Sequence, residues 1–529
     1  MWPLVALVLG LGCGSGEPKP ETGETGETGD SGGDSALPET GIVRVQVDAG
    51  RLEDVDLVVW TYEVRDLGYA SNDDEAPRFH LVVNEERVSA GEPQPLLVWL
   101  HGGVSGIPDD EEFGTFCSMY AEANKGSTLL EIIQGAVDSH GNLWSLADQR
   151  GWMIAIPEST WCDHWAGRGA DDPMNPTNYS LVHIETILDA LTDGLDGVQA
   201  DSSAVYAWGT SIGGAGVFPV AYGLDGQSSR FAGVVADSGP VSLTEWYETD
   251  YYRPVVEHLV GGAAYDEKTG EATEYMSAYS LIDGPLLIQQ NGFRVPVFSA
   301  YNTYDTLTTV QHGDNLEAAL ETHYGADGAR YFSHDFQHYA PGERYHTQTQ
   351  GSYVPWLYTA ESAFSFLEGR EVRFLEAESF CDEGVCALIQ ETDADADENA
   401  SSFSLGGVVK KEPKDGFGTL FSGTLPDDLP RGVEIELLVI TKATGLQSSN
   451  NDLLVTDMTV WSEGNAVVAH RRLNAMDFAP EGEASLAQHQ AQVEATRFSM
   501  TLPEDGDHWL EMTYEARGTV YLDGFWVLN

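Results

Sequence analysis

The sequence predicts an α/β sheet with helices on both faces, followed by an all-β sandwich. Between residues 42 and 369, short apolar runs alternate regularly with segments of helical spacing, a pattern typical of parallel sheets covered by helices. After Gly369 the chain changes to short strand-like segments separated by Gly, Asp and Asn turns, which favours a sandwich. The third observation is a Gly-x-Ser-x-Gly sequence at 209–213 that directly follows an apolar run.

Length and charge limit the classes of function. The chain has 529 residues, enough for two or three domains of ordinary size, and 42% of them are hydrophobic, which excludes wholesale disorder. Lys plus Arg is 26 and Asp plus Glu is 85, so the formal net charge is 26 − 85 = −59. A general basic surface for nucleic acid or for an anionic membrane is therefore excluded.

The N-terminal segment predicts export. Residues 1–13 form an apolar stretch that ends at Cys13; it is shorter than the about 20 residues needed to span a bilayer and has the length of a signal-peptide core. Leu9-Gly10-Leu11-Gly12-Cys13 resembles a bacterial lipobox, which implies that Cys13 carries a lipid and that the membrane is contacted only through it. The alternative is an ordinary secretory signal and a secreted protein. Residues 14–41 contain almost nothing apolar and predict a disordered acidic linker.

Export makes disulfides permissible for the four remaining cysteines. Cys381 and Cys386 are close enough in sequence for a small local loop, and Cys117 would then pair with Cys162. The spacing alone leaves this connectivity open.

The expected elements follow from apolar periodicity. We expect strands at 43–47, 55–64, 78–84, 95–100, 151–157, 204–208, 231–236 and 295–301, and helices at 144–150, 179–195, 215–222, 316–323 and 356–367. In the second unit we expect strands at 433–440, 453–461, 466–473, 497–502, 508–514 and 519–528, with a helical segment at 484–494. The domains are therefore expected at 42–369 and 370–529.

Ser211 is the candidate nucleophile. Its flanking glycines allow a tight turn from strand to helix that exposes the serine hydroxyl above the sheet. A serine needs a base and an acid that orients the base, and in this arrangement the chain order is Ser, then Asp or Glu, then His. Asp305 is the only carboxylate in the loop after the strand at 295–301.

The base must follow Asp305. His346 lies after a Pro-Gly loop and is the preferred candidate, with His338 as the alternative; His334 is also in this region, whereas His312 and His323 are expected on the surface of a helix. For the oxyanion, we expect backbone N–H donors at Ile212 and at Gly103 or its neighbour Val104, because glycines after a strand let backbone groups approach a carbonyl oxygen.

From about residue 42 to 369 the chain resembles the α/β-hydrolase superfamily, and it is most similar to secreted esterases of the feruloyl esterase and polyhydroxybutyrate depolymerase type. The matching segments are 95–104, 146–157, 161–165, 201–214 and 231–239. The resemblance implies a Ser-His-Asp esterase in which Ser211, His346 and Asp305 act. Insertions at 104–142 and 240–293 exceed the simplest members, so the substrate is not implied.

The second unit resembles carbohydrate-binding β-sandwich modules of the galactose-binding-like type, a jelly-roll-like fold. An Ala-Glu strand opens it at 377–378 and a Leu-Asp strand closes it at 522–523. In such modules these carboxylates hold a structural calcium, so the resemblance implies that Glu376, Glu378 and Asp523 are ligands. Carboxylate oxygens suit Ca²⁺.

Together these observations predict an exported serine esterase that needs no cofactor for catalysis and acts on an ester substrate, which could be linked to a polysaccharide or be a polyester. One alternative is a serine peptidase on the same fold, since fold does not separate ester from amide cleavage. The other is an inactive scaffold whose sandwich binds carbohydrate. The oligomeric state is not predicted.

Overall fold

The computed structural model describes residues 41–46, 57–65, 77–100, 143–157, 165, 179–222, 230–248, 253, 256–257, 263–266, 268–273, 283–289, 293–303, 305, 308–325, 330–336, 354–377, 388–389, 408–411, 418–444, 454–464, 466–474, 492–514 and 519–529. In these residues, none of the helices has the length and apolar character needed to cross a membrane.

Nine of the described strands form one mixed sheet in the order β1-β2-β3-β5-β4-β6-β7-β8-β9. The strands β1, β2, β3 and β5 pair antiparallel, and every pair from β5 to β9 is parallel. The carboxyl ends of β6, β7 and β8 therefore meet at one edge of the sheet. Their bounds, in chain order, are Gly41–Gln46, Leu57–Arg65, Arg78–Asn84, Gln94–Leu100 (β4), Met153–Pro157 (β5), Ala200–Thr210, Gly233–Asp237, Val297–Asn302 and Tyr331–Phe336.

Helices cover both faces of this sheet, because central strands such as β4 are apolar on both sides. Leu96 and Val98 join a core cluster that includes side chains of α5, α6, α10 and α11. Leu97 and Trp99 point the other way and join a second cluster with α4 and α12. The helices are α1 (Glu85–Ala90), α4 (Leu143–Gln149), α5 (Tyr179–Asp193), α6 (Ile212–Tyr222), α7 (Leu243–Glu248), α10 (Gly284–Gln289), α11 (Val310–Tyr324) and α12 (Val354–Leu367).

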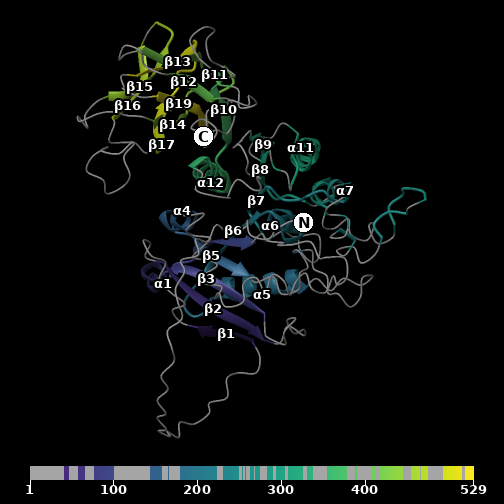
Figure 1. Cartoon of the computed structure of the whole chain (residues 1–529). Coiled ribbons are helices and arrows are strands. Elements are labelled where there is room, and N and C mark those ends of the chain that lie inside the picture. The colour runs from purple at the N-terminus through teal and green to yellow at the C-terminus, as the bar shows by residue number, and fades with distance from the viewer. Residues whose placement is uncertain are drawn as a thin grey trace, which may run out of the picture.

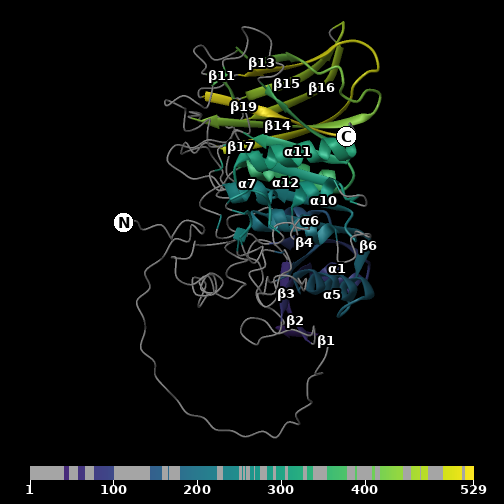
Figure 2. The same cartoon turned by 90° about the vertical axis from the view of Figure 1, so that its right-hand side faces the viewer.

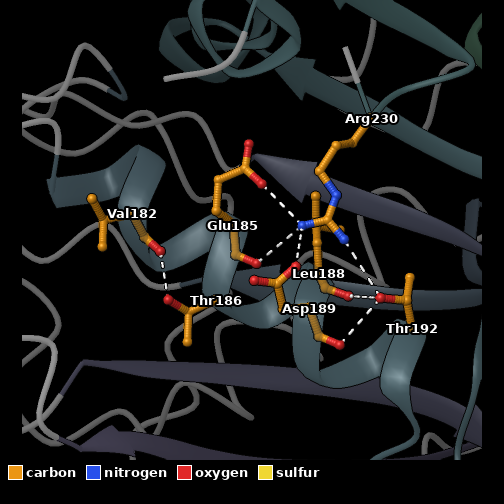
Figure 3. Close-up of polar contacts among 7 residues, drawn as sticks. All are labelled: Val182, Glu185, Thr186, Leu188, Asp189, Thr192 and Arg230. Carbon is orange, nitrogen blue, oxygen red and sulfur yellow. Dashed lines mark hydrogen bonds and ion pairs between the residues drawn. The ribbon is translucent and has the colours of Figure 1, made fainter. Parts of the chain in front are cut away.

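Helix α5 is also tied to the sheet by Arg230, which lies just before β7 (Figure 3). The Arg230 Nη1 lies 3.0 Å from Glu185 Oε2 and 2.6 Å from Asp189 Oδ1, and its Nη2 lies 3.5 Å from Thr192 Oγ1. The Asp189 side chain is largely exposed, so this pair contributes at most about 1 kcal/mol. These contacts join α5 to the residues just before β7.

The residues after α12 form two antiparallel sheets. One has six strands, with the path β11-β12-β19-β14-β17 and β10 paired to β19, and the other has the order β13-β18-β15-β16. Side chains from both sheets, including Leu437 of β14 and Met512 of β18, form one core. The bounds are β10 Val372–Glu376, β11 Leu388–Ile389, β12 Val408–Lys411, β13 Gly418–Thr424, β14 Glu434–Thr444, β15 Leu454–Ser462, β16 Ala466–Asn474, β17 Gln492–Thr501, β18 His508–Tyr514 and β19 Thr519–Leu528. We call this part the C-terminal β unit.

The C-terminal β unit packs directly on the α/β part. In Figures 1 and 2 it lies beside α12, and β1 lies at the far end of the molecule. Phe374 and Trp526 belong to the same core cluster as Phe364 of α12 and Phe332 of β9. The Trp526 ring lies 5.4 Å from that of Phe332 and 5.0 Å from that of Phe374, measured between centroids. We call this shared layer the seam.

Charged side chains border the seam. Arg497 of β17 contacts Glu361 of α12, and its Nε lies 2.8 Å from Glu436 Oε1 of β14. Arg150 Nε lies 3.3 Å from Glu368 Oε1, and its guanidinium lies over the Phe364 ring at 5.1 Å. Arg497 thus forms an ion pair across the junction of the two parts.

Most expected elements lie where the periodicity predicts them, but the last three residues of the helix expected at 484–494 belong to a strand. Gln492 to Glu494 begin β17, where Glu494 pairs with Thr441 of β14. Pairing with a long neighbouring strand outweighs helical propensity there, since propensity is a weak prior against tertiary contacts.

Candidate active site

Ser211 lies on a strained turn between β6 and α6. Its φ is +57°, a left-handed conformation that is uncommon for a residue with a side chain and costs on the order of 1–3 kcal/mol. The turn is held because the Ser211 N–H donates to Asp237 O at 2.9 Å and the Ala215 N–H donates to Ser211 O at 3.2 Å. The serine therefore lies at the carboxyl edge of the sheet and at the start of a helix.

Glycine is required on both sides of this serine. A Cβ at Gly209 would lie 1.9 Å from the carbonyl oxygen of Gly213, and a Cβ at Gly239 would lie 2.4 Å from the carbonyl carbon of Gly214. Real side chains do not tolerate such distances, so the strand, the turn and the segment after β7 can close on one another only where no Cβ is present. The predicted strand-turn-helix context of the motif is present.

Asp305 lies beyond the carboxyl end of β8, two strands from β6. The residue is 5% exposed. Its N–H donates to Asn302 O at 2.9 Å, and its Oδ1 accepts from the Thr308 N–H at 2.8 Å. The carboxylate thus accepts from one backbone N–H, and the residue lies at the sheet edge where Ser211 lies.

The segment between these two residues contains a second strained position that sequence reasoning missed. Ser238 has a φ of +47° and is fully buried, and its N–H donates to Ala300 O at 2.9 Å. The Tyr301 hydroxyl donates to Gly239 O at 2.8 Å. Burial holds the pKa of Tyr301 well above its usual value, so the hydroxyl keeps the proton that it donates. The only signal in the sequence was the Ser-Gly pair after an apolar strand.

A second missed contact supports the helix after Ser211. Trp165 is buried and has a φ of +64°. A Cβ placed on Gly216 would lie 2.5 Å from the Cβ of Trp165. The tryptophan therefore packs on the first turns of α6. The segment at 161–165 was recognised by resemblance, but its packing partner was not.

Three of the candidate histidines have well-defined contacts. The prediction that His312 lies on the surface is wrong: it is 1% exposed, and its Nδ1 accepts from the Ser242 N–H at 3.2 Å. Burial lowers the pKa of His312 to about 3, so it stays neutral. His323 Nε2 lies 2.8 Å from Phe293 O, and His334 Nε2 lies 3.5 Å from Glu376 Oε1. His312 was misjudged because its helix is largely polar, while the loop that covers it follows a different strand.

Several predicted site residues lie outside the described part of the chain. These are the candidate bases His338 and His346, the oxyanion positions Gly103 and Val104, the calcium candidate Glu378, and the cysteines at 13, 117, 162, 381 and 386. Ile212, the other predicted oxyanion donor, is the first residue of α6.

The proposed calcium ligands are described only in part. Pairing of β10 with β19 places Glu376 opposite Gly524, next to Asp523. The Glu376 carboxylate faces His334, whose hydrogen bond holds the pKa of that carboxyl below its usual value. Among the residues that the structure describes, no three His, Cys, Asp or Glu side chains gather as a metal site. The calcium site stays a prediction.

Comparisons with known proteins add little beyond this geometry. No family model matches the chain, and no curated protein matches it. Among solved structures, it is similar to S-formylglutathione hydrolase from Agrobacterium tumefaciens (15% identity, 59% of this chain and 95% of that one, TM-score 0.38). It is also similar to esterase B from Lactobacillus rhamnosis (14%, 59% and 87%, TM-score 0.40) and to prolyl oligopeptidase B from Galerina marginata (11%, 59% and 36%, TM-score 0.34). Such values say nothing of substrate, and the fold description rests on the mixed sheet and the Ser211 turn.

Proposed function

We propose that the protein is a serine hydrolase of the α/β-hydrolase type that cleaves carboxylic esters through an acyl-enzyme. The observation that carries this proposal is the strained Ser211 turn between β6 and α6, closed by glycines that admit no Cβ. Backbone strain of this kind persists where function requires it. The buried Asp305 at the end of β8 supplies the acid in the required chain order.

In the proposed mechanism the Ser211 hydroxyl oxygen attacks the ester carbonyl, and a histidine takes the hydroxyl proton. The same histidine returns that proton to the leaving alcohol, and water then hydrolyses the acyl-enzyme by the reverse route. Asp305 orients the histidine and stabilises its charged form. We assign the oxyanion donors to the N–H of Ile212 and the backbone of Gly103 or Val104.

The setting of the enzyme is proposed from the sequence alone. We propose export with a lipid on Cys13, and an ester substrate that is linked to a polysaccharide or is a polyester. The C-terminal β unit would then be a jelly-roll-like carbohydrate-binding module. Loss of the protein from the membrane fraction in Cys13→Ala checks the anchor, and co-sedimentation of the full chain with insoluble polysaccharides checks the module.

A fluorophosphonate probe tests the enzymatic proposal, because only an activated serine is phosphonylated. We expect the full chain to be labelled at Ser211, with no labelling of Ser211→Ala. Failure to label the folded wild-type chain would favour the inactive binding scaffold. Rates on matched p-nitrophenyl ester and p-nitroanilide substrates separate an esterase from a peptidase.

The identity of the base is a separate prediction. We expect His346→Ala to abolish ester hydrolysis, because the serine then has no proton acceptor, and His338→Ala to retain much of it. Steady-state kinetics of the two variants, each checked for folding by circular dichroism, decide the question. The reverse result assigns the role to His338 and leaves the rest of the mechanism intact.

The calcium prediction is tested by chelation. If Glu376, Glu378 and Asp523 hold an ion that binds only the folded state, its removal lowers stability, by about 2.7 kcal/mol when the ion is present at a hundredfold excess over Kd. The melting curve is measured on the full chain, because the C-terminal β unit shares the seam with the hydrolase part. A curve that chelator leaves unchanged rejects the site.

A further inference from the structure

The buried side chain of Tyr301 joins two of the strands that end at the candidate site. Tyr301 belongs to β8, the strand that leads to Asp305, and its hydroxyl donates at 2.8 Å to the carbonyl oxygen of Gly239, which follows β7. We call residues 237–239, at the carboxyl end of β7, the β7 turn. The argument below concerns what this hydrogen bond does for the nucleophile, and the inference therefore rests on the proposed hydrolase function.

The β7 turn supports the turn that carries Ser211. The Ser211 N–H donates to Asp237 O at 2.9 Å. A Cβ at Gly214, in the first turn of α6, would lie 2.8 Å from Asp237 O and 3.0 Å from the Cα of Gly239. The two turns are in direct backbone contact, so a displacement of the β7 turn also displaces Ser211 and the N–H of Ile212 beside it.

The β7 turn is itself strained and has to be held in place. Ser238 has a φ of +47°, and a conformation of this kind persists only where the surrounding structure enforces it. Two hydrogen bonds to β8 contribute: the Ser238 N–H donates to Ala300 O at 2.9 Å, and the Tyr301 hydroxyl donates to Gly239 O. The first bond joins two backbone groups, whereas the second depends on one side chain and can be removed by one substitution.

The Tyr301 side chain holds the β7 turn from a fixed position. The residue is fully buried, and a Cβ at Gly313 would lie 2.9 Å from Tyr301 Cδ2, so the backbone of α11 packs directly on the ring. Burial, and to a lesser degree three nearby carboxylates, raise the pKa of the hydroxyl well above the ordinary value of tyrosine; the carboxylates are those of Asp335, Asp237 and Asp305. The hydroxyl therefore stays protonated and remains a hydrogen-bond donor.

We propose that Tyr301 is a positioning residue for the nucleophile: by holding the β7 turn at Gly239, it keeps Ser211 in the orientation needed for attack. In this scheme Tyr301 touches no reacting atom and acts only through the backbone of the β7 turn. Such positioning matters because a misplacement of 1 Å caused by a distant change can cost about a hundredfold in rate.

The test compares two tyrosine hydroxyls that bind backbone carbonyls at opposite ends of β8. Tyr301→Phe removes the bond at the carboxyl end of the strand. Tyr324→Phe is the matched control, because the Tyr324 hydroxyl donates at 2.7 Å to Val295 O, just before the strand begins. We expect Tyr301→Phe to fold, since Gly239 O also accepts from the Val241 N–H at 2.8 Å and keeps that donor in the variant.

We expect Tyr301→Phe to lower kcat about tenfold at unchanged KM, because a displaced nucleophile weakens the transition state and leaves substrate binding intact. The rate constant of fluorophosphonate labelling should fall by the same factor. The end point of labelling counts the folded chains, so the rate constant for each labelled chain is independent of any loss of folded protein. Tyr324→Phe is expected to keep the wild-type kcat, KM and labelling rate.

The outcomes separate this proposal from the function on which it rests. If the wild-type chain labels and Tyr301→Phe labels at the same rate, the positioning role is wrong although the protein is a serine hydrolase. An equal fall in Tyr301→Phe and Tyr324→Phe also overturns the proposal, since the loss would then reflect weaker packing around β8 in general. If the wild-type chain itself does not label, the proposed function is wrong, and the positioning role is wrong with it.

A second variant covers the case in which Tyr301→Phe yields no folded protein. Ser238→Ala keeps the backbone of the β7 turn and removes the hydroxyl that lies 3.2 Å from Asp237 Oδ1. We expect slower labelling in this variant, because the strained turn loses one of the contacts that hold it. A wild-type labelling rate in Ser238→Ala overturns the proposal.

Discussion

Replacing Ser211 with alanine is expected to reduce hydrolysis of a p-nitrophenyl ester by several powers of ten while the protein stays folded. The change removes only the attacking hydroxyl, and loss of one triad member typically costs a factor of about 10⁴–10⁶ in kcat. Folding should persist because the turn is held by backbone hydrogen bonds from Ser211 and Ala215 and by the close glycine contacts, none of which uses the hydroxyl as donor.

The measurement is kcat/KM of wild type and Ser211→Ala, with melting temperature as the check on folding. Ser203→Ala is a useful control, because that serine lies on the same strand β6 and its hydroxyl donates at an exposed position to Asp201. We expect Ser203→Ala to keep wild-type activity. Activity retained by Ser211→Ala would remove the proposed nucleophile and with it the acyl-enzyme mechanism.

Replacing Trp526 with alanine should destabilise the whole chain rather than the C-terminal β unit alone. The indole is fully buried in the seam, between Phe332 of the α/β part and Phe374 of β10. Truncation of a buried tryptophan leaves a cavity and costs about 3–5 kcal/mol. Because the cavity opens into a cluster that also contains Phe364 of α12, both parts lose the same contacts.

Denaturant unfolding followed by ester hydrolysis and by intrinsic fluorescence measures this effect. We expect the activity midpoint of Trp526→Ala to fall together with the fluorescence midpoint. Trp509→Ala is the matched control, since Trp509 is half-buried on β18 of the four-stranded sheet, and its loss should change the midpoint of activity far less. If Trp526→Ala loses activity at the same denaturant concentration as the wild type, the seam does not couple the stability of the two parts.

The geometry of the candidate site was predictable where it is local in sequence. The Ser211 turn needs an apolar strand, flanking glycines and a following helix within about a dozen residues. This pattern can therefore be recognised in the sequence without knowledge of the fold. Asp305 could be placed because parallel strands bring their carboxyl ends to one edge. Tyr301 and Ser238 were missed because their roles depend on which strands are neighbours in space.

The seam was beyond sequence reasoning for the same reason. Trp526 lies in a segment that periodicity predicts to be a strand, but alternation says only that one face of a strand is buried and not which partner buries it. His312 was placed on the surface for a related reason, since its helix is polar while the chain at Ser242 covers that one imidazole. Contacts between distant segments depend on tertiary packing. The pattern of a single sequence contains little information about such packing.

The seam also has a consequence for how the protein is made. Strand β19 pairs with β10, β12 and β14, and its Trp526 completes the layer over Phe332 and Phe364. The chain must therefore be synthesised about 300 residues past Ser211 before the sheet that carries Ser211 acquires its final cover, so we expect its folding to be completed late, although N-terminal domains generally fold first during synthesis. Until then an aromatic surface stays exposed. A chaperone that holds the nascent chain would suit such a protein, and a ribosome-stalled chain ending before β19 should carry no activity.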